Sequence, residues 1–139
     1  MSEEKMVTYH GVYEHQEVTL KVETYTEGHH LAVVMYTKEG GRLELYSDVT
    51  VNLPGYFLKP NEAFITDFTS KDLLTFIQQY QLGKVLPEKG HSGFCTYAKV
   101  AFDLDKLAEY DPKGVECFRK WHGIERKTNP PKKKKQIER

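Results

Sequence analysis

The chain has 139 residues, 39% of them hydrophobic and 12% aromatic, with 20 basic and 20 acidic side chains. This length and composition predict a globular protein that buries roughly two-thirds of its unfolded surface and needs no disulfide or structural metal. No apolar run approaches the roughly 20 residues that cross a bilayer, which excludes a membrane-spanning helix. The acidic start has no secretory signal, and Cys95 and Cys117 lack metal-ligand spacing, so we expect a cytoplasmic protein in a reducing environment.

The neutral total hides an uneven distribution of charge. Residues 126–139 contain seven basic residues and one acidic residue, a net charge of +6, and the other 125 residues carry −6. This basic segment contains Pro-Pro and has no apolar periodicity, which predicts a disordered tail. The predicted organisation is therefore a single domain over 1–125 and a tail over 126–139.

The first part of the chain, residues 6–51, has the period of two that is typical of strands. Apolar and polar residues alternate along 18–26, the pattern of a half-buried strand. The Gly-Gly pair within 38–41 lies between two further alternating runs and predicts a hairpin turn, because glycine tolerates positive φ. We expect an antiparallel meander of three or four strands here.

The segment 52–65, NLPGYFLKPNEAFI, combines prolines, a glycine and an acid with apolar side chains. Pro54 ends the preceding strand, since it cannot donate a ladder hydrogen bond, and 59–61 predicts a second turn. The segment is interpreted as a crossover that places its apolar side chains in the core. The Glu62 carboxylate is predicted to interact with Asn61 or with the main-chain amides of the turn.

Residues 70–81 have an apolar stripe with helical spacing, which predicts a helix that faces the core. The stripe consists of Leu73, Phe76, Ile77 and Tyr80. Thr69 and Asp72 fit a capping box, and Gly83 stands where a helix C-terminus favours glycine.

The remaining elements are shorter. The polar segment 87–93 is predicted as a loop, and 94–102 as a strand with Phe94 on its apolar face. A helical turn at 104–108 and a helix from Pro112 to a terminal glycine follow. Together the elements predict an α+β fold: a twisted antiparallel sheet of about five strands, the 70–81 helix on one face and a short C-terminal helix.

The histidines do not predict a metal site. His29 and His30 are adjacent, so in a strand they would point to opposite faces. His10 and His15 have no acid or cysteine at a diagnostic spacing, and the two acids within 103–105 are not followed by further calcium ligands. These acids are assigned as caps of the following turn.

His91 and Cys95 are the two groups from which an enzyme could be built, because a cysteine nucleophile needs a nearby imidazole. A turn into a strand separates them, and the structural interpretation is a glycine-bearing loop that returns the chain to the sheet. Nucleotide-binding and zinc-protease motifs are absent from the sequence. We therefore predict no catalytic residue, no cofactor and no metal.

Three motifs occur in a fixed order: N-L-P-x-x-x-L-x-x-N-E-A-F-I at 52–65, Gly-Lys at 83–84, and G-x-x-G-F at 90–94. This order resembles a family of small bacterial domains of unknown function that are met in conjugative plasmids, transposons and prophages. The resemblance covers roughly residues 17–107. It implies a cytoplasmic accessory protein of a mobile element that acts on another macromolecule, and it implies no catalytic residue.

The absent active site and this resemblance favour a non-enzymatic protein that acts by protein–protein binding, for example as an inhibitor of a host defence or nuclease complex. The candidate partner-binding residues are Tyr56, Lys59, Asn61, Glu62 and His91. The alternative is nucleic-acid binding through the basic tail, by neutralisation of phosphates. The candidate contacts are then Lys132, Lys133, Lys134 and Lys135. The tail lacks aromatic residues for base stacking, and the body is acidic.

Overall fold

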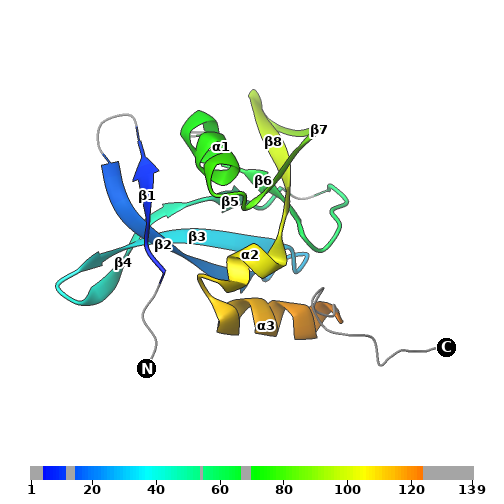
Figure 1. Ribbon diagram of the computed structural model, residues 1–139. Coiled ribbons are helices and arrows are strands. Elements are labelled where there is room, and N and C mark those ends of the chain that lie inside the picture. Colours follow the sequence, from blue (N-terminus) through cyan, green and yellow to red (C-terminus); the bar gives the residue numbers. More distant parts are fainter. Residues whose placement is uncertain (1–4, 12–14, 54, 67–69, 124–139) are drawn as a thin grey trace.

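The computed structural model describes residues 5–11, 15–53, 55–66 and 70–123. The described residues form eight β-strands and three α-helices, and the strands make two antiparallel sheets of four (Figure 1). The predicted α+β class is confirmed. The predicted tail, 126–139, and the predicted capping residue Thr69 lie outside the described residues.

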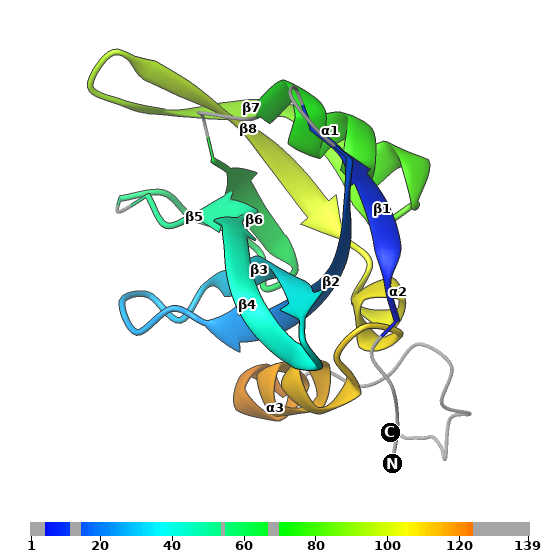
Figure 2. The ribbon, with the colours of Figure 1, turned by 90° about the vertical axis from the view of Figure 1, so that its left-hand side faces the viewer.

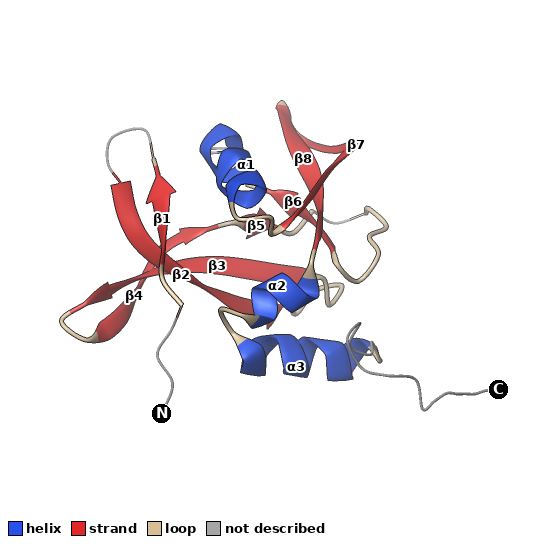
Figure 3. Cartoon of the chain, viewed as in Figure 1, coloured by secondary structure: helices blue, strands red, loops and turns tan. Residues whose placement is uncertain are grey.

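The two sheets differ in strand order. Sheet A follows the sequence, with β1 (Val7–His10), β2 (His15–Thr24), β3 (Leu31–Glu39) and β4 (Arg42–Asp48). Sheet B has the order β5 (Thr50–Val51), β6 (Glu62–Ile65), β8 (Cys95–Phe102) and β7 (Gly83–Ser92). The helices are α1 (Ser70–Gln79), α2 (Leu104–Ala108) and α3 (Pro112–His122). Figures 1 and 3 show α1 and α3 on opposite sides of β2 and β3.

The eight strands in two sheets differ from the single sheet of about five strands that the sequence predicts. The chain changes sheets directly after β4. There Val49 donates its N–H to the Val33 carbonyl (3.0 Å), and the Val33 N–H donates to the Thr50 hydroxyl (3.0 Å). Thr66, which follows β6, donates its N–H to the Val49 carbonyl (3.1 Å). Periodicity reports which face of a strand is buried, and it does not report this change of partner.

The predicted helix is present as α1, and its apolar stripe faces the core. Leu73, Phe76 and Ile77 are buried in one cluster with Leu20 of sheet A and Val100 of sheet B. Burial of each large apolar side chain contributes about 1.5–3 kcal/mol to stability. The helix is thus the element that closes the main core between the two sheets.

The end of α1 differs from the prediction. Gln81, not Gly83, adopts the left-handed conformation after the helix (φ 57°), and the Leu82 N–H donates to the Ile77 carbonyl (2.9 Å). Gly83 begins β7, where an added Cβ would lie 2.7 Å from the Ala101 carbonyl oxygen. The glycine is needed there for close approach to β8, which helix-capping rules do not address.

Residues 87–92 of the predicted loop 87–93 form the second half of the strand β7, so this prediction was wrong. Lys89, Gly90 and His91 pair with β8, after a register shift that accommodates the preceding residues. The segment has a loop-like composition because β7 is an edge strand whose side chains are mostly exposed. The turn is the two-residue Gly93-Phe94, so that Phe94 lies at the hairpin tip and not on an apolar strand face.

Asp111 joins α3 to sheet A. One carboxylate oxygen accepts from the Gly114 N–H (3.1 Å) as the helix cap, and the other accepts from the Val22 N–H (3.0 Å). A Cβ at Gly114 would lie 2.5 Å from the Val22 carbonyl oxygen, so only glycine permits this approach. Val115 and Phe118 are then buried in the main core. One carboxylate therefore closes a strand edge and begins a helix.

We predict that Asp111→Ala lowers the free energy of unfolding by about 2 kcal/mol or more, because it removes a helix cap and leaves the Val22 N–H without its acceptor. Urea denaturation measures the change. Glu116→Ala on the same helix is the matched control and should change stability by less than about 0.5 kcal/mol, since its ion pair with Lys120 is exposed. Equal stability of the two variants would contradict the assignment.

Candidate functional site

The described residues of the segment 52–61 cover one face of sheet B and build a second, smaller core. Leu53 and Leu58 from the segment are buried with Phe64 of β6, and Tyr56 and Tyr97 pack against them. The neighbours of Phe64 on β6 turn to the opposite face and join the main core. The predicted crossover therefore has its own core partners.

Gly90 of β7 makes room for this second core. An added Cβ would lie 2.7 Å from Phe64 Cε1 and 2.8 Å from Leu53 Cδ1. A β-strand with any other residue at this position would be pushed away from the segment. The glycine of the G-x-x-G-F motif thus has a packing role.

Tyr56 connects the segment 52–61 to the β7–β8 hairpin through hydrogen bonds. Its hydroxyl accepts from the His91 N–H (2.7 Å) and donates to the His91 carbonyl (3.3 Å), and its ring packs edge-on against Phe64 with centroids 5.1 Å apart. The structure thus brings together two of the predicted site residues, although His91 contributes its main chain. One hydroxyl satisfies both backbone groups of an edge-strand residue.

Glu62 and Asn61 hold the second turn of the segment. The Glu62 Oε1 atom accepts from the Lys59 N–H (3.0 Å) and lies 3.5 Å from Lys99 Nζ, in a pair whose side chains are 11% and 15% exposed. This confirms the assignment of Glu62 to a turn amide. Asn61 donates its side-chain amide to the Phe102 carbonyl (2.9 Å). Both side chains are engaged inside the chain, while Lys59 is exposed.

The His91 and Cys95 pair does not form a nucleophile and base. The His91 imidazole Nδ1 lies 3.3 Å from the Thr96 hydroxyl, and His91 pairs with Thr96 across the hairpin. Cys95 is the residue next to Thr96 on β8, so it faces the other side of the ribbon. This arrangement therefore does not support the hypothesis of a Cys95 nucleophile that is activated by His91.

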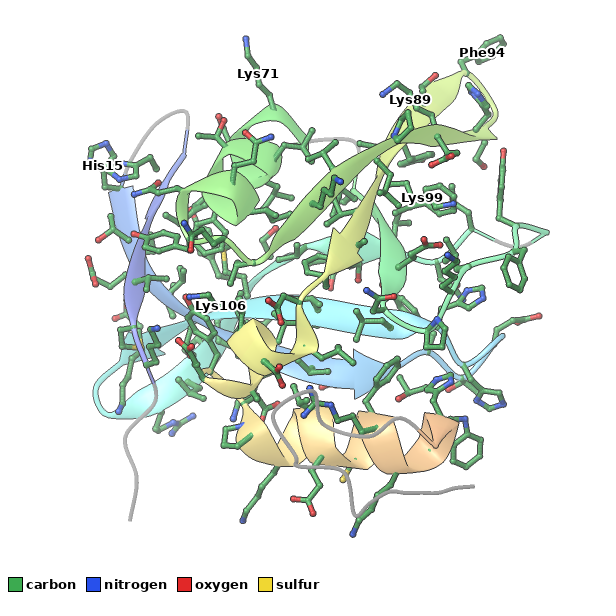
Figure 4. All side chains as sticks on the ribbon, turned by 45° about the vertical axis from the view of Figure 1, so that its right-hand side comes forward. His15, Lys71, Lys89, Phe94, Lys99 and Lys106 are labelled. Carbon is green, nitrogen blue, oxygen red and sulfur yellow. The ribbon has the colours of Figure 1, made fainter. Side chains whose placement is uncertain are left out.

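Two exposed aromatic residues were not predicted as surface features. The sequence left open whether Phe57 or Leu58 enters the core: Leu58 is buried, Phe57 is 83% exposed, and Phe94 is fully exposed. Phe57 follows Tyr56 directly, and Phe94 lies three residues after His91. Figure 4 shows Phe94 pointing outward from the end of the hairpin. The signal that could have found it is Gly93, whose positive φ (61°) marks a two-residue hairpin turn.

A separate group of aromatic rings lies at the end of α3. The Trp121 ring, 62% exposed, lies 4.9 Å from the His29 ring, and His122 Nε2 lies 2.9 Å from the His29 carbonyl oxygen. His30 turns instead to Asn52, whose Oδ1 is 3.1 Å from its Nδ1. The two histidines lie between β2 and β3, where His29 has a positive φ (57°), and not in the strand for which opposite faces were predicted, but they do have different partners.

The described residues contain no group of three or more histidine, cysteine, aspartate or glutamate side chains that could hold a metal ion. His10 and His15 face each other across the β1–β2 pair with ring centroids 4.3 Å apart. Cys95 and Cys117 are free thiols. Within the same described ranges, no helix has the length and apolar content that a bilayer crossing requires.

Comparison with known proteins assigns a family. A family model described as Domain of unknown function (DUF4313) matches residues 19–121, which is most of the chain. The chain belongs to this family. The match in this DUF4313 chain extends beyond residue 107, where the sequence resemblance ended, and it includes α3 as far as Trp121. No curated protein and no solved structure matches it.

We predict that Tyr56→Phe accelerates hydrogen exchange of the His91 amide by about fivefold, because a neutral hydrogen bond contributes about 1 kcal/mol and the ring contact is kept. Amide exchange followed by NMR measures this. Tyr80→Phe is the matched control, since the Tyr80 hydroxyl binds Thr8 in the same manner and should release only the Thr8 amide. If both variants accelerate hydrogen exchange of the same amides, the Tyr56–His91 hydrogen bonds do not act locally, and the prediction is contradicted.

Proposed function

We propose that this DUF4313 chain is a non-enzymatic accessory protein of a mobile genetic element that acts in the cytoplasm by binding another protein. Phe57 and Phe94 support the proposal: two large exposed aromatic side chains on segments joined by the Tyr56–His91 hydrogen bonds. The mobile-element context is motivated by the motif order at 52–65, 83–84 and 90–94. Inhibition of a host defence or nuclease complex is the form of binding that we propose.

Exposed aromatic residues on a fixed scaffold suit a protein interface. Aromatic side chains are enriched at binding hot spots, where they enter pockets of the partner at a small cost in conformational entropy. The segment 52–61 is held by its own core and by Tyr56, so less order must be gained on binding. Figure 2 shows the end of the β7–β8 hairpin projecting beyond the remainder of the molecule.

The charges around these aromatic residues define the partner further. The exposed charged side chains of residues 55–61 and of the half of β7 nearer the hairpin tip are Lys59, Glu88 and Lys89. Two of these three are basic, and Figure 4 shows Lys89 on the hairpin that carries Phe94. A partner that offers an apolar pocket with an acidic rim would complement this surface.

We predict that the double variant Phe57→Ala with Phe94→Ala loses its partner in affinity capture from the native host, with at least about a tenfold drop in captured protein, because hot-spot aromatics cost about 2 kcal/mol or more on truncation. Quantitative mass spectrometry of the captured proteins measures this. Trp121→Ala, which removes an exposed aromatic elsewhere, is the matched control and should capture the partner normally.

The stability of the double variant should stay within about 0.5 kcal/mol of the unchanged protein, since both side chains are exposed. Equal capture by the double variant and the unchanged chain would contradict the assignment of this surface. The absence of any stable associated protein would contradict the binding function itself.

Nucleic-acid binding is a second candidate function, and Trp121 is the observation that favours it. Trp121 is 62% exposed and lies two residues before Gly123, the last described residue, so it is close in sequence to the basic tail. Stacking of bases on an aromatic ring contributes about 1–3 kcal/mol per base. Trp121 would supply the aromatic platform that the tail itself lacks, and Lys132 to Lys135 would contact phosphates.

For this second function we predict that removal of residues 126–139 abolishes binding of a single-stranded oligonucleotide and flattens its salt dependence, by about 0.7 in slope for each phosphate that the tail neutralises. Trp121→Ala should weaken binding with the slope unchanged. Fluorescence anisotropy over a range of salt concentrations measures both effects. A shortened chain that binds as well as the full chain would remove this candidate.

A further inference from the structure

His10 and His15 form a pair across two neighbouring strands. His10 ends β1, His15 begins β2, and the two residues are register partners. Their imidazole rings lie 4.3 Å apart between centroids, and both side chains are exposed. In the sequence neither histidine has an acid or a cysteine at a diagnostic spacing. The strand pairing supplies the neighbour, and it is the other imidazole.

The direction of the main chain shows that this pair is of the closer kind. The Tyr80 hydroxyl accepts from the Thr8 N–H (3.1 Å) and donates to the Thr8 carbonyl (3.0 Å), so both groups of Thr8 point away from β2. The direction alternates along a strand, and the main-chain groups of His10 therefore point away from β2 as well. His10 and His15 are then a non-hydrogen-bonded antiparallel pair, in which the Cα atoms are about 4.5 Å apart and the side chains are closest.

The backbone beneath the two rings is fixed on both strands. β2 lies between β1 and β3 in sheet A, and Tyr80 holds β1 two residues before His10. Tyr9 and Val18, one on each strand, are buried in the main core. A ligand of the two imidazoles therefore requires rotation of exposed side chains only, which occurs within nanoseconds and costs little order.

We propose that His10 and His15 together bind one borderline divalent ion, of which Zn²⁺ is the representative. With Zn–N bonds of about 2.0–2.1 Å at a tetrahedral angle, two imidazole centroids on one ion lie about 5 Å apart. The observed 4.3 Å is within about 1 Å of that separation. Imidazole nitrogen suits Zn²⁺, Ni²⁺ and Cu²⁺, whereas Mg²⁺ and Ca²⁺ prefer oxygen ligands.

The site takes two ligands from the protein. The described part of the chain contains no group of three histidine, cysteine, aspartate or glutamate side chains that could hold a metal, so water fills the remaining coordination positions. An ion held in this way exchanges with solvent. The site is thus suited to a response to metal concentration and not to a permanent structural metal.

Glu17 places a negative charge beside the pair. Thr8 and Glu17 are the next register partners on the same face, and the Thr8 hydroxyl donates to Glu17 Oε2 (2.6 Å). This carboxylate lies two residues along the strand from His15, about 7 Å away. It attracts the cation through space and is not counted as a ligand.

The bound ion would connect the end of β1 to β2. Figure 4 shows His15 on the opposite side of the molecule from Phe94, so the ion would leave the aromatic surface uncovered. The inference therefore does not depend on the proposed binding function. Its structural effect is on Tyr9, which lies next to His10 and whose main-chain groups point toward β2.

Titration of the full chain with Zn²⁺, followed by calorimetry and by NMR, tests the proposal. One ion per chain should bind, and Mg²⁺ at the same concentrations should not. His10→Gln and His15→Gln should each raise the dissociation constant by about tenfold or more, because each leaves a single imidazole. His91→Gln is the matched control and should bind normally, since it removes an exposed histidine whose cross-strand partner is Thr96.

Two further measurements separate this site from binding elsewhere. Glu17→Gln keeps an acceptor for the Thr8 hydroxyl and removes the charge, so it should weaken Zn²⁺ binding by about threefold at low salt. Zn²⁺ at a hundredfold excess over Kd should slow hydrogen exchange of the Tyr9 amide by about tenfold or more, because opening of the β1–β2 pair then requires loss of the ion. Circular dichroism should report the same secondary structure for all variants, since the altered side chains are exposed.

Three results would overturn the proposal. The first is an unchanged protein that shows no saturable Zn²⁺ binding up to millimolar concentration. The second is Zn²⁺ binding that His10→Gln and His15→Gln weaken no more than His91→Gln does, since the ion would then be held elsewhere. The third is Zn²⁺ binding that leaves exchange of the Tyr9 amide unchanged, because an ion shared by the two histidines must hold the strands together.

Discussion

Main-chain groups at the edges of two short sheets must find partners, and the structure depends on this constraint. Buried or half-buried N–H and C=O groups are costly unless they are bonded, and a sheet of four strands has two edges. The main-chain groups of Val33 connect the two sheets, since the Val33 N–H donates to the Thr50 hydroxyl and the Val33 carbonyl accepts from the Val49 N–H. At Val22 it joins sheet A to α3 through Asp111.

The same constraint explains the segment 52–61. Its apolar side chains cover one face of sheet B, and its Tyr56 and Asn61 side chains bind main-chain groups that β7 and β8 leave open. Asn61 binds Phe102 through both its main chain and its side-chain amide. The residues shared with the family motif thus hold the scaffold, and the exposed Phe57 lies in a position that the motif leaves variable.

The candidate site could be predicted in part. The segment 52–65 and the 90–94 motif stand out in the sequence, and Tyr56 and His91 do meet. The sequence offered Phe57 as an alternative to Leu58 in the core and placed Phe94 on the apolar face of a strand, because apolar residues within a pattern are interpreted as buried. Their exposure follows from the turns that carry them, and the position of a turn depends on which strands pair. The hydrogen bonds that Asn61 and Glu62 make within the chain depend on that strand pairing as well.

By itself the sequence determined the local elements: the alternating strands of 18–51, the helix α1 with its buried stripe, the Gly-Gly turn and the Asp-Pro start of α3. These follow from side-chain periodicity and from backbone preferences, which act over a few residues. Only the tertiary structure decided that the strands divide into two sheets, that 87–92 is an edge strand, and that Gly83, Gly90 and Gly114 are sites of close approach. Those outcomes depend on atoms that are distant in the chain and meet only when the sheets have formed.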